Sequence, residues 1–144
     1  MIPTDQNLRG FTMAPEKQAT DLPGYRKKSF LLYYNGGEIW FEHLEGMYEN
    51  EDLVIEKLNF DVPSFTKPSS TSFICFVFFD TVITDDIILA VAKAVLESKK
   101  RFNKIAFCGS DRKSQKKFKK ALMDHGFGMA FFDGLEDAKV WLLP

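Results

Sequence analysis

The residues best suited to chemistry in this 144-residue chain follow a short apolar segment, Lys104 to Cys108. Gly109, Ser110 and Arg112 come directly after it and offer a tight turn, a hydroxyl group and a guanidinium, which together could hold a phosphate or a carboxylate. Open α/β sheets bind ligands at the carboxyl ends of parallel strands. We therefore name Gly109, Ser110 and Arg112 as a candidate anion or ligand site, and an ordinary strand-to-helix turn is the alternative.

A second candidate is the loop that holds Asp80, Thr84, Asp85 and Asp86, between an apolar segment and a helical pattern. Thr84 or Asp85 is the natural N-cap of that helix, where the following acids favour the positive end of the helix dipole. A phosphate on Thr84 would gain from the helix N-terminus but would be repelled by Asp85 and Asp86. We predict a capping role for Thr84 and an interaction loop for the four residues together.

Metal, cofactor and catalytic chemistry have little support in the sequence. His43 and His125 are the only histidines, and neither has cysteines or carboxylates at ligand spacing. Cys75 and Cys108 lie in apolar segments and are predicted to be reduced core thiols. No nucleophile stands on a strained elbow. We therefore predict a non-enzymatic protein without a metal or a cofactor.

Charge is distributed unevenly, although the net charge is only -1. Residues 38–61 hold eight acids and one base, whereas residues 93–120 hold eleven bases and two acids. Such asymmetry can steer a charged protein partner or promote association of two copies, and two solvated helix faces would give the same pattern. Only Phe118 interleaves with the lysines of residues 113–120, so the sequence predicts no nucleic-acid platform.

The apolar patterns predict a mixed, mostly parallel α/β sheet. Residues 30–34 and 38–42 read as a hairpin across Asn35-Gly36-Gly37, followed by a helix over 51–58 that residues 61–63 end. Residues 73–79 are continuously apolar, which is typical of a central strand covered on both faces. A helix over 85–101 and two further strand–helix units then complete a fold with about four helices, whose last strands are 104–108 and 128–132.

The sequence also suggests the organisation and the setting of the protein. Residues 1–28 read as a flexible N-terminal tail before a domain over 29–144. No apolar run reaches the roughly 20 residues that span a bilayer, and no secretory signal is visible, so we expect a cytoplasmic protein without a membrane span. The aromatic residues could line a pocket for a small lipophilic ligand or could simply form the core. They are Tyr33, Tyr34, Trp40, Phe41, Phe65, Phe78, Phe79 and Trp141.

The order of elements and two segments resemble the STAS superfamily, the domains of sulphate transporters and anti-sigma-factor antagonists. The likeness is to its SpoIIAA-like branch, whose members tend to carry a lysine-led strand of the type KIAFCGS and a closing FFDGLEDAKVWL segment. Both stand here, at 104–110 and 131–142, within a resemblance that covers about residues 29–143.

This resemblance implies a βα superhelical sheet in a bacterial regulatory domain that binds an unidentified protein partner. Binding or sensing of a small lipophilic or anionic ligand between sheet and helices is the alternative. Antagonist members carry a phosphorylatable serine in a pattern like Asp-Ser-Ser-Gly before the second helix. This chain has Ile83-Thr84-Asp85-Asp86 there, with neither the serine nor the glycine.

Overall fold

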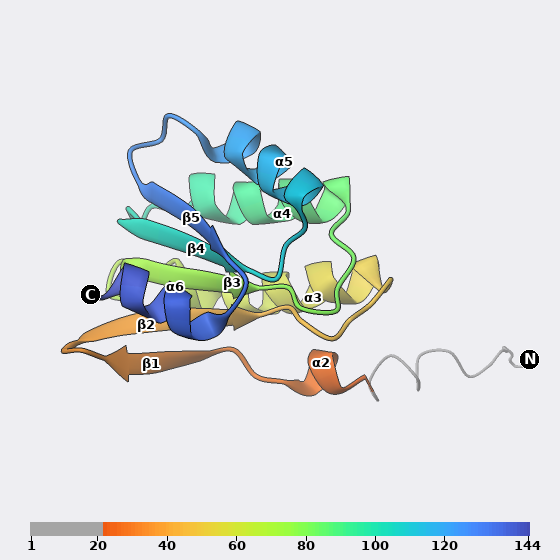
Figure 1. Cartoon of the computed structure of the whole chain (residues 1–144), viewed down its shortest axis with the longest axis horizontal. Coiled ribbons are helices and arrows are strands. Elements are labelled where there is room, and N and C mark those ends of the chain that lie inside the picture. The colour runs from red at the N-terminus through yellow and green to blue at the C-terminus, as the bar shows by residue number, and fades with distance from the viewer. Residues whose placement is uncertain (1–21) are drawn as a thin grey trace, which may run out of the picture.

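The computed structural model describes residues 22–144. These residues form five strands and five helices, which carry the labels of Figure 1. The strands are β1 (Phe30–Tyr34), β2 (Gly37–His43), β3 (Phe73–Val77), β4 (Lys104–Cys108) and β5 (Gly128–Phe132). The helices are α2 (Pro23–Arg26), α3 (Glu51–Phe65), α4 (Asp85–Leu96), α5 (Arg112–Leu122) and α6 (Leu135–Leu142).

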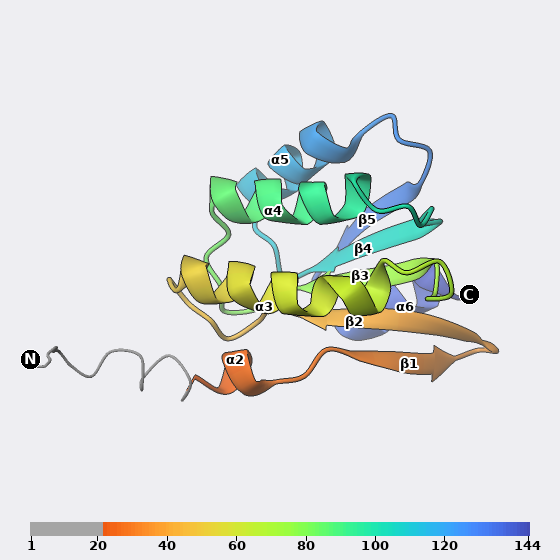
Figure 2. The same cartoon turned by 180° about the vertical axis from the view of Figure 1, so that it is seen from behind.

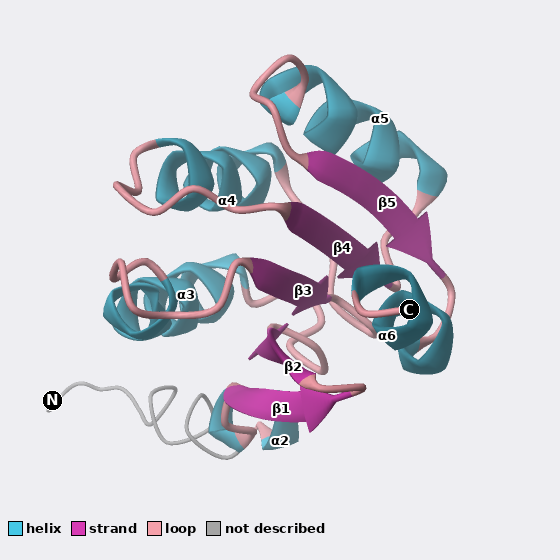
Figure 3. Ribbon diagram, turned by 90° about the vertical axis from the view of Figure 1, so that its left-hand side faces the viewer, coloured by secondary structure: helices cyan, strands magenta, loops and turns pink. Residues whose placement is uncertain are grey.

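The strands form one sheet in the order β1-β2-β3-β4-β5. β1 runs antiparallel to β2, and every other neighbouring pair is parallel. Helices α3, α4 and α5 pack on one face and α6 on the other, as the end-on view of Figure 3 shows. The predicted α/β class, with a mixed and mostly parallel sheet and an N-terminal hairpin at its edge, is confirmed.

The hairpin turn follows from two residues with positive φ angles. Asn35 has φ 47° and Gly36 has φ 82°, and the turn closes where Tyr34 pairs with Gly37. A type I′ turn requires positive φ at both central residues, which asparagine and glycine adopt most easily. The hairpin expected from the Asn-Gly pair is therefore present.

Strand β3 lies in the middle of the sheet, as its continuous apolar run predicted. Ile74 and Phe76 join the core under α3, α4 and α5, whereas Cys75 and Val77 join the core under α6. The strand ends at Val77 and not at the predicted Phe79, because the chain turns there: the amide of Thr81 donates to the carbonyl oxygen of Phe78 at 3.1 Å.

Phenylalanines form the centre of the larger core. The ring centroids of Phe107 and Phe118 lie 4.4 Å apart, and those of Phe76 and Phe107 lie 5.5 Å apart. Phe65 meets Phe76 edge-on at an interplanar angle of 89°. Such pairs add about 0.5–1.5 kcal/mol beyond the burial of their surface. The abundance of phenylalanine is thus explained mainly by packing between the sheet and three helices.

Helix α3 is longer than predicted. It continues through Pro63 to Phe65, whereas the sequence predicted an end at residues 61–63. A proline inside a helix costs about 3 kcal/mol because it removes one backbone hydrogen bond and crowds the preceding turn. Phe65 is fully buried against Phe76 and Trp40, and this burial offsets the cost. Helix α4, by contrast, ends at Leu96, before the predicted Arg101.

The predicted N-terminal tail of residues 1–28 lies mostly outside the described residues. Within the described part, α2 packs closely on the chain that leaves β2. A Cβ atom on Gly24 would lie 1.9 Å from the carbonyl oxygen of Glu45, so only glycine fits there. Residues 23–26 are thus part of the folded domain, and Figure 2 shows α2 beside the N-terminal end of β1.

The two cysteines are free and buried on the α6 side of the sheet, as expected for core thiols. Their sulfur atoms lie 3.5 Å apart on neighbouring strands. The contact with Cys108, together with burial, raises the pKa of the Cys75 thiol, whereas the same contact lowers the pKa of Cys108. None of the helices in the described part of the chain is long and apolar enough to cross a membrane.

Candidate functional site

Two loops at the carboxyl edge of the sheet are joined to each other by backbone hydrogen bonds. The loop after β2 contributes Tyr48, whose amide donates to the carbonyl oxygen of Asp80 at 2.8 Å. The amide of Val82 donates back to the carbonyl oxygen of Tyr48, also at 2.8 Å. This exchange forms a short parallel bridge between Tyr48 and Thr81 outside the main sheet.

Both sides of this bridge use an unusual backbone conformation. Tyr48 has φ 50° and Asp80 has φ 55°, in the left-handed region that side chains with a Cβ atom seldom adopt. Each such residue costs on the order of 1–2 kcal/mol. The cost is sustained because the surrounding hydrogen bonds fix the loops, and residues held in this way cluster at functional sites.

The side chain of Thr81 further secures the two loops. Its hydroxyl group donates to the carbonyl oxygen of Leu44 at 2.7 Å and accepts from the amide of Met47 at 3.1 Å. Gly46 adds a third connection, since its amide donates to the carbonyl oxygen of Phe79 at 2.7 Å. The loops after β2 and β3 therefore form one rigid platform, and we call residues 44–50 and 78–84 the loop platform.

The loop platform presents apolar side chains to solvent. Tyr48 is 56% exposed and Val82 is 52% exposed, although Met47 beside them is fully buried. Leu89, on the first turns of α4, is exposed as well, and it lines a groove of about 610 Å³ between α3 and α4. A rigid exposed aromatic residue with apolar neighbours is the arrangement in which interface anchors occur.

The predicted interaction loop forms the acidic part of this surface. Asp80, Asp85 and Asp86 are exposed at the edge of the platform. Asp85 pairs with Lys117 of α5 at 2.5 Å, and this hydrogen bond and charge lower the pKa of Asp85. Tyr48 was not predicted as a site residue, because no local feature of the sequence indicates that the loops after β2 and β3 meet.

Thr84 caps α4 as predicted. Its hydroxyl oxygen accepts from the amide of Ile87 at 3.3 Å, and the same hydroxyl donates to the Glu51 carboxylate. A phosphate at this position would meet the carboxylates of Glu51, Asp85 and Asp86. The hydroxyl therefore serves in a structural role within the platform.

The second candidate, Gly109 with Ser110 and Arg112, forms the turn from β4 into α5. Asp111 is the N-cap residue of this helix, and its carboxylate accepts from the amide of Ser114 at 2.7 Å. This carboxylate occupies the helix N-terminus, where a bound anion would otherwise lie. Arg112 is exposed, and the hydroxyl oxygen of Ser110 is buried without a partner among residues 22–144. The anion site at these residues stays a prediction.

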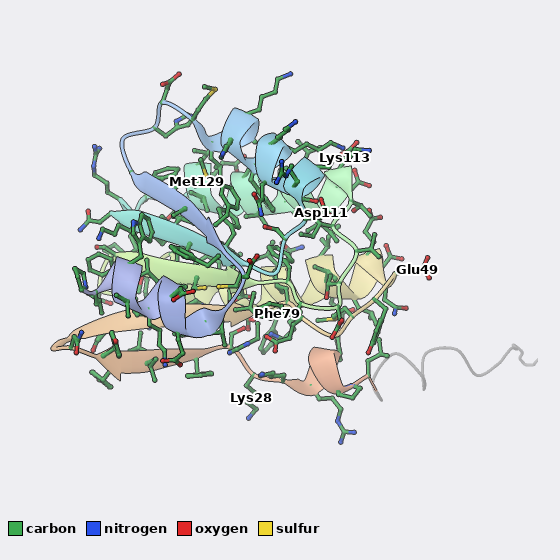
Figure 4. The ribbon with its side chains drawn as sticks, in the orientation of Figure 1. Lys28, Glu49, Phe79, Asp111, Lys113 and Met129 are labelled. Atoms are coloured by element: carbon green, nitrogen blue, oxygen red, sulfur yellow. The ribbon has the colours of Figure 1, made fainter. Side chains whose placement is uncertain are left out.

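The acidic and the basic segments of the sequence occupy separate parts of one end of the molecule. Figure 4 shows Glu49, from the acidic segment, and Lys113, from the lysine-rich α5, at the same end of the molecule, and α4 lies between α3 and α5. The ion pair between Asp85 and Lys117 marks the border. The platform itself therefore favours partners with basic side chains.

The aromatic residues that could have lined one lipophilic pocket are spread over the molecule. Phe65 and Phe78 belong to the core under α3, α4 and α5, and Phe41 belongs to the core under α6. Tyr33 is 75% exposed on β1. The described structure therefore places several of these residues in the core, the other use expected for them, and Trp40 lines a pocket that is described below.

Comparisons with protein-family models, with curated proteins and with solved structures find no match to this chain.

Proposed function

We propose that this chain is a non-enzymatic, STAS-like regulatory domain of the bacterial cytoplasm that binds a protein partner on the loop platform. The observation that carries the proposal is the rigid presentation of Tyr48 and Val82 by two loops in strained, mutually bonded conformations. The resemblance of residues 104–110 and 131–142 to SpoIIAA-like domains supports a role in protein binding.

The chemistry of the surface defines the class of partner. Apolar side chains of Tyr48, Val82 and Leu89 stand beside the carboxylates of Asp80 and Asp86. The complementary surface has an apolar centre with lysine or arginine at its rim. Rim charges act mainly on the association rate and are screened over about 10 Å at 0.1 M salt. Binding is therefore expected to weaken as salt increases.

A partner found by affinity purification and then purified tests this proposal by titration against defined variants. Tyr48→Ser with Val82→Ser is expected to weaken binding at least tenfold, because each tenfold change corresponds to about 1.4 kcal/mol and both apolar anchors are lost. Tyr33→Ser with Val140→Ser is the matched control, since these residues are the same types and are exposed elsewhere.

Equal losses in the two pairs of variants would remove the loop platform as the binding surface. Asp86→Asn separates the electrostatic contribution and is expected to flatten the salt dependence. Sedimentation of the purified chain alone at low salt distinguishes a foreign partner from the lysine-rich α5 of a second copy, which would give a salt-sensitive dimer.

A further inference from the structure

A pocket of about 570 Å³ opens between α2, the segment leading into β1, strand β2 and helix α3. Of the residues that the sequence singled out, only Trp40, one of the candidate pocket aromatics, lines it. Trp40 of β2 and Phe60 of α3 supply aromatic surface, and Arg26 and Lys28 stand on the segment beside them. Figure 4 shows Lys28 on the part of the chain that leads from α2 toward β1.

The floor of the pocket is a network of buried polar groups. Lys57 is only 7% exposed, and its ammonium group donates to the hydroxyl oxygen of Ser29 at 2.9 Å and to the carbonyl oxygen of His43 at 2.5 Å. The Ser29 hydroxyl donates in turn to the carboxylate of Asp61 at 2.9 Å. Buried polar networks of this kind fix side chains in one geometry, which is what a binding site needs.

Glu42 lies beneath this floor and is fully buried. One carboxyl oxygen accepts from the indole N–H of Trp40 at 2.9 Å, and the other has no hydrogen-bond partner among residues 22–144. Burial, and next the neighbouring carboxylate of Asp61, raise the pKa of Glu42 to about 9. The carboxyl group therefore carries no negative charge into the pocket at neutral pH.

The charge of the pocket is consequently positive. Four basic side chains, Arg26, Lys27, Lys28 and Lys57, line it together with two carboxylates, those of Glu56 and Asp61. Arg26 and Lys28 form no ion pair with a carboxylate of the described residues. Two cationic groups are thus available to a ligand at the mouth of the pocket.

The pocket also has apolar walls, which would suit an apolar part of a bound molecule. Phe60 is 83% exposed, an unusual degree for a phenylalanine on a helix of the folded domain. Tyr25 adds a ring whose hydroxyl group donates to Glu56 at 2.9 Å. Ligand sites combine such apolar walls with a few fixed polar groups. An apolar body bound against Phe60 and Trp40 would cover surface that is now exposed.

We propose that this pocket binds a small organic anion with an apolar or aromatic body, its charged group held by Arg26 and Lys28 and its body by Trp40 and Phe60. The class includes aryl and alkyl carboxylates and sulfonates. This site shares no residue with the loop platform, so the proposal stands apart from the proposed function.

Naphthalene-2-sulfonate is a suitable probe, with 2-naphthylmethanol as its neutral counterpart. A nitrogen–proton NMR spectrum of the full chain contains two indole N–H signals. The Trp40 signal reports on the pocket that this residue lines, and the Trp141 signal reports on the α6 side of the sheet, where Trp141 packs against Phe132. The sulfonate is expected to shift the Trp40 signal saturably and to leave the Trp141 signal in place, and the alcohol is expected to bind at least tenfold more weakly.

Variants then assign the contacts. Arg26→Gln with Lys28→Gln is expected to weaken sulfonate binding at least tenfold, whereas Lys116→Gln with Lys120→Gln, which removes the same charge from exposed positions on α5, is expected to leave it unchanged. Phe60→Ser is expected to weaken binding several-fold, with Val140→Ser as the control. The proposal is overturned by an unsaturable Trp40 shift, by equal affinity for the alcohol, or by equal effects of the two charge-removing variants.

Discussion

The carboxyl group of Glu42 connects proton binding to stability at the level of a single residue. It is buried beside Asp61, and its pKa of about 9 lies far above that of an exposed glutamate. The folded protein therefore keeps a proton that the unfolded chain releases as the pH rises through the ordinary range near 4.5. By linkage, the free energy of unfolding falls between that pH and about 9.

Glu42→Gln is expected to remove this fall, because the amide keeps the shape and cannot ionise. Urea unfolding at pH 5 and pH 7 measures this change. The free energy of unfolding of the wild type should fall by about 2 kcal/mol relative to that of the variant over this interval. Glu49→Gln, at an exposed position, controls for the loss of a carboxylate. Parallel stability curves for wild type and Glu42→Gln would show that Glu42 is ionised in the folded protein.

A local signal in the sequence was sufficient for the residue that caps α4. Thr84 accepts from a helix amide as predicted, because capping depends on neighbours three positions away, and Asp111 caps α5 in the same way. Glu42 appeared only as one acid in an acidic segment. Its burial depends on α3 crossing over β2, and the neighbouring Asp61 is 19 positions further along the chain.

The elements of the fold were mostly visible in the apolar patterns, and their ends were not. The hairpin and the central strand followed from Asn35-Gly36 and from residues 73–79, whose signals are local. The end of α3 did not, because the burial of Phe65 overrides the breaking effect of Pro63. The short helix α2 was missed because it depends on packing against the loop after β2.

Gly24→Ala tests the packing of α2. The added methyl group would collide with backbone atoms of Glu45 and Gly46, so α2 is expected to detach and its amides to exchange hydrogen much faster. Hydrogen–deuterium exchange of residues 22–28, followed by mass spectrometry, measures this. Gly134→Ala is the control, because no atom lies within 4 Å of a Cβ at that position. Unchanged protection of α2 in Gly24→Ala would contradict the packing described.

At the scale of the whole molecule, the fold brings together features that lie far apart in the sequence. The loop platform combines two segments, whose hydrogen-bonded residues Tyr48 and Asp80 are 32 positions apart in the sequence. The pocket lined by Trp40 and Phe60 combines three further segments. The sequence predicted the acidic loop because a parallel sheet directs such loops to its carboxyl edge. It could not predict which side chains the two loops expose, since that depends on the positive φ angles at Tyr48 and Asp80.

Site-specific photo-crosslinking tests the proposed binding surface most directly. A benzophenone amino acid replaces Tyr48 in one full-length variant and Tyr33, the more exposed tyrosine of β1, in another, and both are irradiated in living cells. A discrete crosslinked protein is expected from position 48, absent from position 33 and reduced by Asp86→Asn. The same adducts from both positions, or none from position 48 when position 33 yields one, would contradict the proposed binding surface.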